Sequence, residues 1–256
     1  LKSKIIYFVH GYRFHPKGNF LLNKIFFLIE KLLSYKTFCY ININKIDYYI
    51  TKKLFKKKSL LIDGVGIDIN KKYYSFNGDI NKNFTIGYIA AYKKNKGYNE
   101  LLKLSKMLSI YKNIKIDCYG YGNINYFKKK KKFLKLNNII LNNFNKNILV
   151  SIKSFDVMLS FSKREGLPVS FLESMSQGVP VIANDVRGSN DLINHQINGF
   201  LLDSKNIVRS AYDYLVLLNE NRNKLLELSL KSFEFIDERF DKTLIAKQVC
   251  KYINDS

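Results

Sequence analysis

Short apolar runs alternate along the chain with longer segments in which apolar residues recur at helical spacing. Runs at residues 4–9, 38–43 and 60–62 predict buried strands, with helices at 20–35 and 45–55 between them. From residue 84 onward the alternation is regular. It predicts strands at 84–90, 114–119, 139–141, 157–161, 179–184 and 199–202, and helices at 99–111, 126–135, 148–154, 169–177, 204–219, 222–238 and 244–254.

Strands that alternate with helices indicate parallel β-sheets with helices on both faces. The polar stretch at residues 68–78 separates a short first set of elements from a longer second set. The pattern therefore predicts an α/β fold with two units, residues 1–75 and 76–236, and a closing helical segment at 237–256.

The composition is that of a folded protein, since hydrophobic residues make up 46% of the 256 residues and charged residues 25%. Cys39, Cys118 and Cys250 match no zinc or disulfide spacing, which favours a reducing compartment. No apolar run reaches the roughly 18 residues that a membrane span needs. The sequence also shows no signal peptide.

The net charge of +22 needs an explanation. Nucleic acid, an anionic membrane surface and anionic small substrates are the candidate partners. Codon bias is a fourth explanation, because lysine, asparagine, isoleucine and tyrosine are all abundant. The five consecutive lysines at 128–132 cannot all share one helix face, so they predict a solvated surface.

The most informative segment follows the predicted strand at 157–161. Pro168 suits the start of a helix, where the N–H groups of Val169 and Ser170 would form an anion site. Glu165 lies in the loop and Glu173 about one turn into the helix, and carboxylates accept hydrogen bonds from paired sugar hydroxyls. The residues alone fit a nucleotide-sugar site and an ordinary surface helix equally well.

This segment resembles the retaining glycosyltransferases of family 4. Glu165 and Glu173 are separated by seven residues, and the sequence reads EGLP at 165–168 and ESMSQGVPVIA at 173–183. The stretches VHGYRFH at 9–15 and DVRGSNDLI at 185–193 resemble signatures of the branch that makes capsular, exopolysaccharide and lipid-linked oligosaccharide chains. Asn190 and Asp191 depart from the second signature.

The resemblance implies a GT-B fold of two Rossmann-like domains. Residues 1–75 would be a partial, N-terminally incomplete acceptor-side domain, and 76–236 the nucleotide-sugar-binding domain. The final helix at 237–256 would pack back on the N-terminal domain. The resemblance also implies that Glu165 holds the donor sugar, that Glu173 binds the ribose and that His10 lies near the anomeric carbon. His10 and Glu165 are therefore the expected catalytic residues, whereas Arg13 and His15 are weaker candidates and His195 is a surface residue.

Further donor contacts are expected from several small groups of residues. Lys96 and Gly97 would hold the diphosphate, in a segment where Ala91 replaces the family's arginine; Lys93, Lys94 or Lys163 could substitute as point charges. Phe144 either lines the base pocket or is a core aromatic. The remaining expected donor-binding residues are Gly120, Gly122, Gly166, Leu167, Val169 and Ser170.

We therefore expect a hexosyltransferase that uses a nucleoside-diphosphate sugar, with UDP favoured, and a glycan or lipid-linked acceptor. Neither a metal nor another cofactor is expected. The basic N-terminal part favours an anionic membrane surface over nucleic acid, and so a cytoplasmic, peripheral location at the inner face of the plasma membrane. The alternatives are a truncated, non-catalytic nucleotide-sugar or membrane-binding relative, and a GT-B sugar-nucleotide epimerase.

Overall fold

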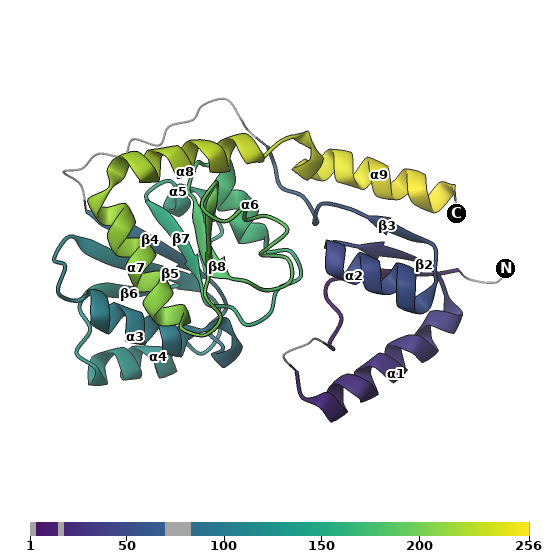
Figure 1. The fold of residues 1–256 in the computed structure, drawn as a ribbon, viewed down its shortest axis with the longest axis horizontal. Helices are drawn as coiled ribbons and strands as arrows, with labels where there is room; N and C mark the ends of the chain where they lie inside the picture. Colours follow the sequence, from purple (N-terminus) through teal and green to yellow (C-terminus); the bar gives the residue numbers. More distant parts are fainter. Residues whose placement is uncertain (1–3, 15–17, 70–82, 256) are drawn as a thin grey trace. The chain divides into compact units, whose positions relative to one another are not determined.

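The computed structural model describes residues 4–14, 18–69 and 83–255 (Figure 1). The chain divides into two compact units. The first contains Leu1–Asp68, Glu165–Val169 and Glu238–Ser256, and the second contains Ile69–Arg164 and Ser170–Asp237. The boundary expected at residue 75 lies outside the described residues.

The first unit is built on a small parallel sheet of order β1-β2-β3. Its strands are β1 (Ile5–Val9), β2 (Thr37–Asn42) and β3 (Ser59–Leu61). The helical elements are α1 (Phe20–Lys36), α2 (Lys45–Ile50), the π-helix Thr51–Phe55, a 3₁₀ turn at Glu238–Phe240, and α9 (Lys242–Asn254). The expected helix at 45–55 therefore changes from α to π geometry partway.

Local capping explains where the helices of this unit begin. The Asn44 side chain accepts a hydrogen bond from the Asp47 N–H at 2.8 Å, so it caps α2. Asn19 caps α1 in the same way through the Leu22 N–H. Helix α9 is tied to this unit by the Ile67 N–H, which donates to the Phe240 carbonyl, and by the Lys242 N–H, which donates to the Ile67 carbonyl.

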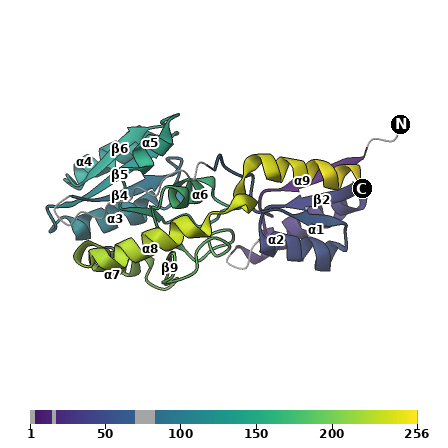
Figure 2. The same cartoon turned by 90° about the horizontal axis from the view of Figure 1, so that it is seen from above.

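The second unit is a six-stranded parallel sheet of order β6-β5-β4-β7-β8-β9 with helices around it (Figures 1 and 2). Its strands are β4 (Phe84–Ile89), β5 (Ile114–Gly120), β6 (Ile139–Asn143), β7 (Val157–Ser160), β8 (Val181–Asn184) and β9 (Gly199–Leu202). Its helices are the 3₁₀ turn Lys94–Lys96, α3 (Tyr98–Leu108), α4 (Ile124–Phe133), α5 (Ile148–Ile152), α6 (Val169–Ser176), α7 (Ile207–Glu220) and α8 (Arg222–Phe235). The predicted parallel α/β architecture is confirmed.

The strand order places a topological switch point at β4 and β7. The chain first adds β5 and β6 on one side of β4, then returns to place β7, β8 and β9 on the other side. Helices on the two sides of such a point diverge, and ligands of parallel α/β sheets bind there, beyond the carboxyl ends of the strands. The fold therefore predicts a ligand site beyond the carboxyl ends of β4 and β7.

No helix in the described ranges is both long and apolar enough to cross a bilayer. Helix α1 is nevertheless unusual, because Ser34 is its only buried residue. Phe27 packs against the small core of this unit, but most of the large apolar side chains of α1 are exposed: Phe20, Leu21, Leu22, Ile25, Leu28, Ile29, Leu32 and Leu33.

A buried ion pair joins the start of β7 to helix α8. The Arg222 Nη1 lies 3.2 Å from the Asp156 Oδ1, and the Arg222 side chain is only 3% exposed. The other carboxylate oxygen of Asp156 accepts from the Thr85 N–H at 2.7 Å, and the guanidinium lies over the Phe84 ring. Removing a carboxylate partner from a buried arginine is destabilising, because no water replaces the lost contact with the buried charge.

We expect Asp156→Ala to lower the free energy of unfolding by about 3 kcal/mol, measured by urea denaturation. The matched control is Asp213→Ala, which removes an exposed pair with Arg209 on α7. That change should lower it by less than about 0.5 kcal/mol. Equal effects of the two substitutions would contradict a stabilising role for the buried pair.

Candidate functional site

The loops that follow β4 and β7 are joined directly at the switch point. The Lys163 N–H donates to the Asn95 carbonyl at 3.1 Å. The Tyr88 hydroxyl accepts from the Phe161 N–H at 3.2 Å and donates to the Lys96 carbonyl. Tyr88, near the carboxyl end of β4, therefore holds both loops in place where the fold predicts a ligand.

Gly97 is required by this junction. Its φ is +75°, and a Cβ placed on it would lie 2.3 Å from the Cβ of Phe161 and 2.6 Å from the Phe161 carbonyl oxygen. A larger residue would push the two loops apart. The Tyr98 hydroxyl donates to the Ala90 carbonyl at 2.7 Å, so the segment 90–97 is held at both ends.

The lysines near Ala91 are held in different ways. Lys96 is half-buried within the loop. The Lys163 ammonium lies 3.3 Å from the Glu100 carboxylate, and the Lys93 ammonium lies 6.0 Å from the centre of the Tyr121 ring. Among the candidate substitutes for the missing arginine, Lys163 already has a carboxylate partner, which leaves Lys93 and Lys94 as the exposed cations of this loop.

Two exposed aromatic residues follow the ends of neighbouring strands. Gly120 and Gly122 flank Tyr121 after β5; a Cβ on Gly120 would lie 2.0 Å from the Ala90 carbonyl oxygen, so this strand end fits closely against the end of β4. Tyr121 is 62% exposed and Phe144, after β6, is 63% exposed. The alternative that Phe144 is a core aromatic is therefore wrong.

Helix α6, which follows the loop after β7, carries the carboxylate of Glu173. The helix begins at Val169, so Pro168 precedes the first helical residue rather than occupying it. The N–H groups in the first turn of a helix lack partners within the helix, and Val169 and Ser170 contribute two of them. Glu173 lies one turn further on and is partly buried. Burial raises the pKa of its carboxyl above the ordinary value.

The loop Glu165–Val169 belongs to the first unit together with His10. A Cβ on Gly166 would lie 2.2 Å from the His10 carbonyl oxygen, so Gly166 allows this loop to approach the end of β1. The His10 ring is exposed and stacks on Phe8 with ring centres 4.9 Å apart. The structure therefore brings the backbone of His10 beside the residue that follows Glu165.

Arg13 and His195 make contacts of their own. His15 lies outside the described residues. Arg13 stacks on the Phe26 ring, and the exposed His195 accepts a hydrogen bond from the Leu201 N–H, as suits a surface residue. Leu167 is buried. Within the described residues, no group of three or more His, Cys, Asp or Glu side chains could hold a metal ion.

The residues that the sequence analysis missed are the ones that position the loops. Tyr88 and Tyr98 bind loop backbone through their hydroxyls, and the Asn184 side chain at the end of β8 donates to the Ser162 carbonyl at 3.1 Å. The detectable signal is a buried tyrosine or asparagine at the carboxyl end of an otherwise apolar strand, where a polar atom needs a partner.

The fold is that of the GT-B glycosyltransferases. The chain superposes on Staphylococcus aureus TarM in a complex with UDP with a TM-score of 0.84, over 98% of this chain and 51% of TarM, at 20% identity. Residues 70–230 match the family described as Glycosyl transferases group 1, and the chain belongs to this family.

Two curated relatives extend the match beyond that segment. The Bacillus subtilis protein EpsD is 28% identical over 218 residues, which are 78% of this chain and 56% of EpsD. The N,N'-diacetylbacillosaminyl-diphospho-undecaprenol α-1,3-N-acetylgalactosaminyltransferase of Campylobacter jejuni is 23% identical over 254 residues, 93% of this chain and 66% of that enzyme. The chain thus spans between about half and two thirds of the length of these three proteins.

We expect Glu173→Gln to raise the free energy of unfolding near neutral pH. A carboxyl whose pKa is raised by folding ionises more readily in the unfolded chain, so stability falls as the pH rises from the unfolded pKa of about 4.3 through the higher folded pKa. The gain should disappear below about pH 4, where the carboxyl is protonated in both states. Urea denaturation at the two pH values measures it.

Glu220→Gln is the matched control, because Glu220 is exposed at the end of α7. It should leave the free energy of unfolding unchanged at both pH values. A Glu173→Gln protein no more stable than the wild type near neutral pH would show that burial does not disfavour the Glu173 carboxylate.

Proposed function

We propose that this chain, as part of a family 4 glycosyltransferase, transfers a hexosyl residue from a UDP-sugar to a glycan or lipid-linked acceptor with retention of configuration. The observation that carries the proposal is the switch point of the second unit. There the loop 90–97, the first turn of α6 and the half-buried Glu173 follow the ends of β4 and β7. The UDP bound to TarM and the undecaprenol-linked acceptor named for the Campylobacter relative support the choice of donor and acceptor.

The diphosphate of the donor would bind at the start of α6 and at Lys96. Helix N-termini bind anions because their free N–H groups and the helix dipole both favour negative charge. When the bond to the leaving diphosphate breaks, negative charge grows on the same oxygens, so these groups stabilise the transition state more than the ground state. Lys93 or Lys94 would supply the charge that Ala91 lacks.

The sugar parts of the donor would bind to carboxylates. Glu173 would accept hydrogen bonds from the ribose hydroxyls, and Glu165 would hold the transferred sugar beside His10. Tyr121 and Phe144, exposed at the ends of β5 and β6, offer flat surfaces for the base. A carboxylate that folding has partly desolvated gains more from a hydroxyl donor than one in water, because less hydration is lost on binding.

The transfer itself would need no metal and no protein nucleophile. The acceptor hydroxyl oxygen would form a bond to the anomeric carbon on the face from which the diphosphate leaves. As the bond from that carbon to the phosphate oxygen breaks, the hydroxyl proton passes to the departing phosphate oxygen. Attack on the same face retains the configuration, and the positive charges around the diphosphate take the place of a metal ion.

We expect the chain to bind UDP, and the full-length protein to release UDP from a UDP-sugar in the presence of acceptor. Glu173→Ala should weaken UDP binding at least about tenfold, since a hydrogen bond to a charged group contributes about 1.5–3 kcal/mol. Isothermal titration calorimetry measures the binding, and chromatography of the released nucleotide measures the transfer. Glu220→Ala is the exposed control and should bind UDP as the wild type does.

A second variant tests the position assigned to the diphosphate. Ala91→Arg should tighten UDP binding and leave uridine binding unchanged, because an arginine fork contacts phosphate oxygens in pairs. Unchanged UDP affinity would refute this position. Wild-type binding of UDP without transfer by the full-length protein would instead support the non-catalytic relative.

We further propose that the first unit contacts an anionic membrane from the cytoplasmic side, as a peripheral protein. Helix α1 exposes Phe20, Leu28 and Leu32 together with Lys24 and Lys31. Apolar side chains enter the interface between headgroups and acyl chains, while lysines are attracted to anionic lipid, so the two contributions add. A lipid-linked acceptor would be presented at the same surface.

Leu28→Ser combined with Leu32→Ser should reduce binding to phosphatidylglycerol vesicles at least about tenfold, because each leucine contributes about 1.5–3 kcal/mol when buried. Vesicle flotation measures this. The control is Leu217→Ser with Leu230→Ser, two partly exposed leucines of the second unit, which should leave flotation unchanged. Flotation that survives the α1 substitutions would rule out this helix as the contact.

A further inference from the structure

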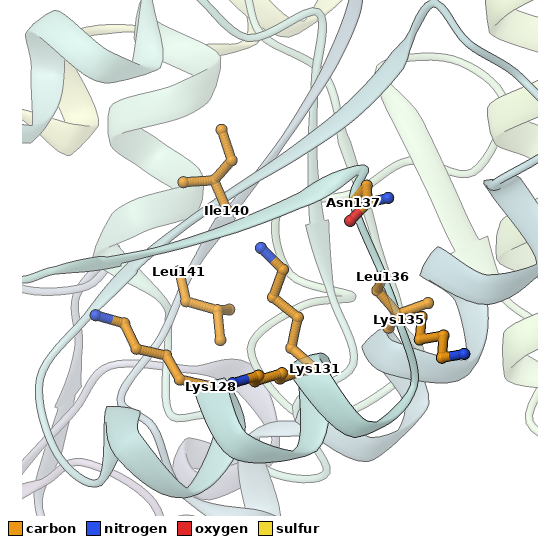
Figure 3. A pocket seen from close by; sticks show the side chains of 8 residues that line it. Lys128, Lys131, Lys135, Leu136, Asn137, Ile140 and Leu141 are labelled. Atoms are coloured by element: carbon orange, nitrogen blue, oxygen red, sulfur yellow. The ribbon is translucent and has the colours of Figure 1, made fainter.

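A cavity of about 540 Å³ lies between helix α4 and strand β6 of the second unit. Its volume is in the range of small-ligand sites. Figure 3 shows Lys128 and Lys131 rising from α4 toward Ile140 and Leu141 on β6. Lys132 and Lys135 complete the basic side of the cavity.

Three of the lysines share one face of α4 because of their spacing. Lys128, Lys131 and Lys132 stand at positions i, i+3 and i+4, which helical geometry brings together. Lys135 follows the end of the helix, where its φ of +51° turns the chain out of helical geometry, and it also lines the cavity. None of the lysines 128–132 is buried, as predicted for a solvated surface, but their side chains do not all have the same surroundings. Lys129 does not line the cavity, and the Lys130 ammonium is bound to the Asn99 side chain at 2.6 Å.

The charge in the cavity is not neutralised by the protein. No acidic side chain is among the residues that line it. Within the described part of the chain, none of the four ammonium groups is paired with a carboxylate. Like charges at helical spacing repel one another, so folding alone does not favour this arrangement. An anion with several negative oxygens would reverse the repulsion.

The rest of the lining is apolar apart from the side chain of Asn137. Leu136 and Leu141 are buried, and Ile140 is 47% exposed on the edge strand β6. The lysine stems can lie along this surface while their ammonium groups point at an anion. The cavity lies on the connection from α4 into β6, and so toward the amino end of that strand. The switch-point loops follow the carboxyl ends of β4 and β7, so the two places are distinct.

We propose that the cavity between α4 and β6 is an accessory site for a multiply charged phosphate group. The four lysines would hold the phosphate oxygens as point charges, and the apolar wall would receive the organic part of the ligand. The phosphate could belong to a soluble phosphorylated molecule or to a lipid headgroup, since the cavity recognises the shared chemistry.

Calorimetric titration of the whole chain tests the proposal with two probes. Sodium tripolyphosphate represents the soluble source, and dihexanoyl phosphatidic acid below its micelle concentration represents the headgroup. The variant replaces Lys128, Lys131 and Lys132 with glutamine. The control, with the same change in charge, replaces Lys103, Lys106 and Lys129, which lie on α3 and α4 outside the cavity lining.

We expect saturable binding of at least one probe to weaken by at least about tenfold in the variant and to stay within about threefold in the control. UDP binding should be unchanged in both proteins. Loss with tripolyphosphate alone identifies a soluble ligand, and loss with phosphatidic acid alone identifies a headgroup. Equal weakening in the variant and the control, or no saturable binding of either probe, would overturn the site.

Discussion

The contact between the ends of β4 and β7 is the constraint on which the candidate site depends. The two strands pair through Ile86 with Val157 and Gly87 with Met158. Beyond these pairs, the link between them is a hydrogen bond from the Phe161 N–H to the Tyr88 hydroxyl. Because the same hydroxyl also donates to the Lys96 carbonyl, both loops that would touch a donor diphosphate are set by one side chain. Gly97 permits this only because it has no Cβ. Substitutions at Tyr88 or Gly97 would therefore shift the position of both loops.

The position of Glu173 lowers the stability of the fold near neutral pH. Folding places its carboxyl in a partly buried position and raises its pKa, so the ionised form is disfavoured in the absence of a ligand. A ligand with hydroxyl donors would remove that disadvantage. The buried pair of Asp156 and Arg222 has the opposite character, because each charge has its partner within the fold. The two carboxylates of this unit therefore differ: the Asp156 carboxylate is stabilised by a partner within the fold, whereas burial disfavours the ionised form of Glu173.

Sequence periodicity was sufficient for the architecture but not for the contacts. The strands and helices were predictable because each buried strand is a short apolar run and each helix has its own spacing, and Glu165 and Glu173 stood out by their motif. The position of Tyr88 between two loops was not predictable, since it depends on β7 returning beside β4. The end of the α-helix at Ile50, where π geometry begins, and the exposure of Phe144 also depend on tertiary neighbours rather than on local pattern.

The lysines that give the chain its net charge of +22 fall into several local groups rather than one continuous basic surface. Lys163 and Lys224 are paired with carboxylates, and Lys130 donates to an asparagine, so these lysines already have partners within the protein. Lys96 lies at the switch point, whereas Lys128 and Lys131 face a cavity at the sheet edge. Nucleic acid requires positive charge in a continuous stripe that follows a backbone. The lysines of this unit instead form separate basic groups, one at a strand end and one beside an edge strand, as the two proposed phosphate sites require.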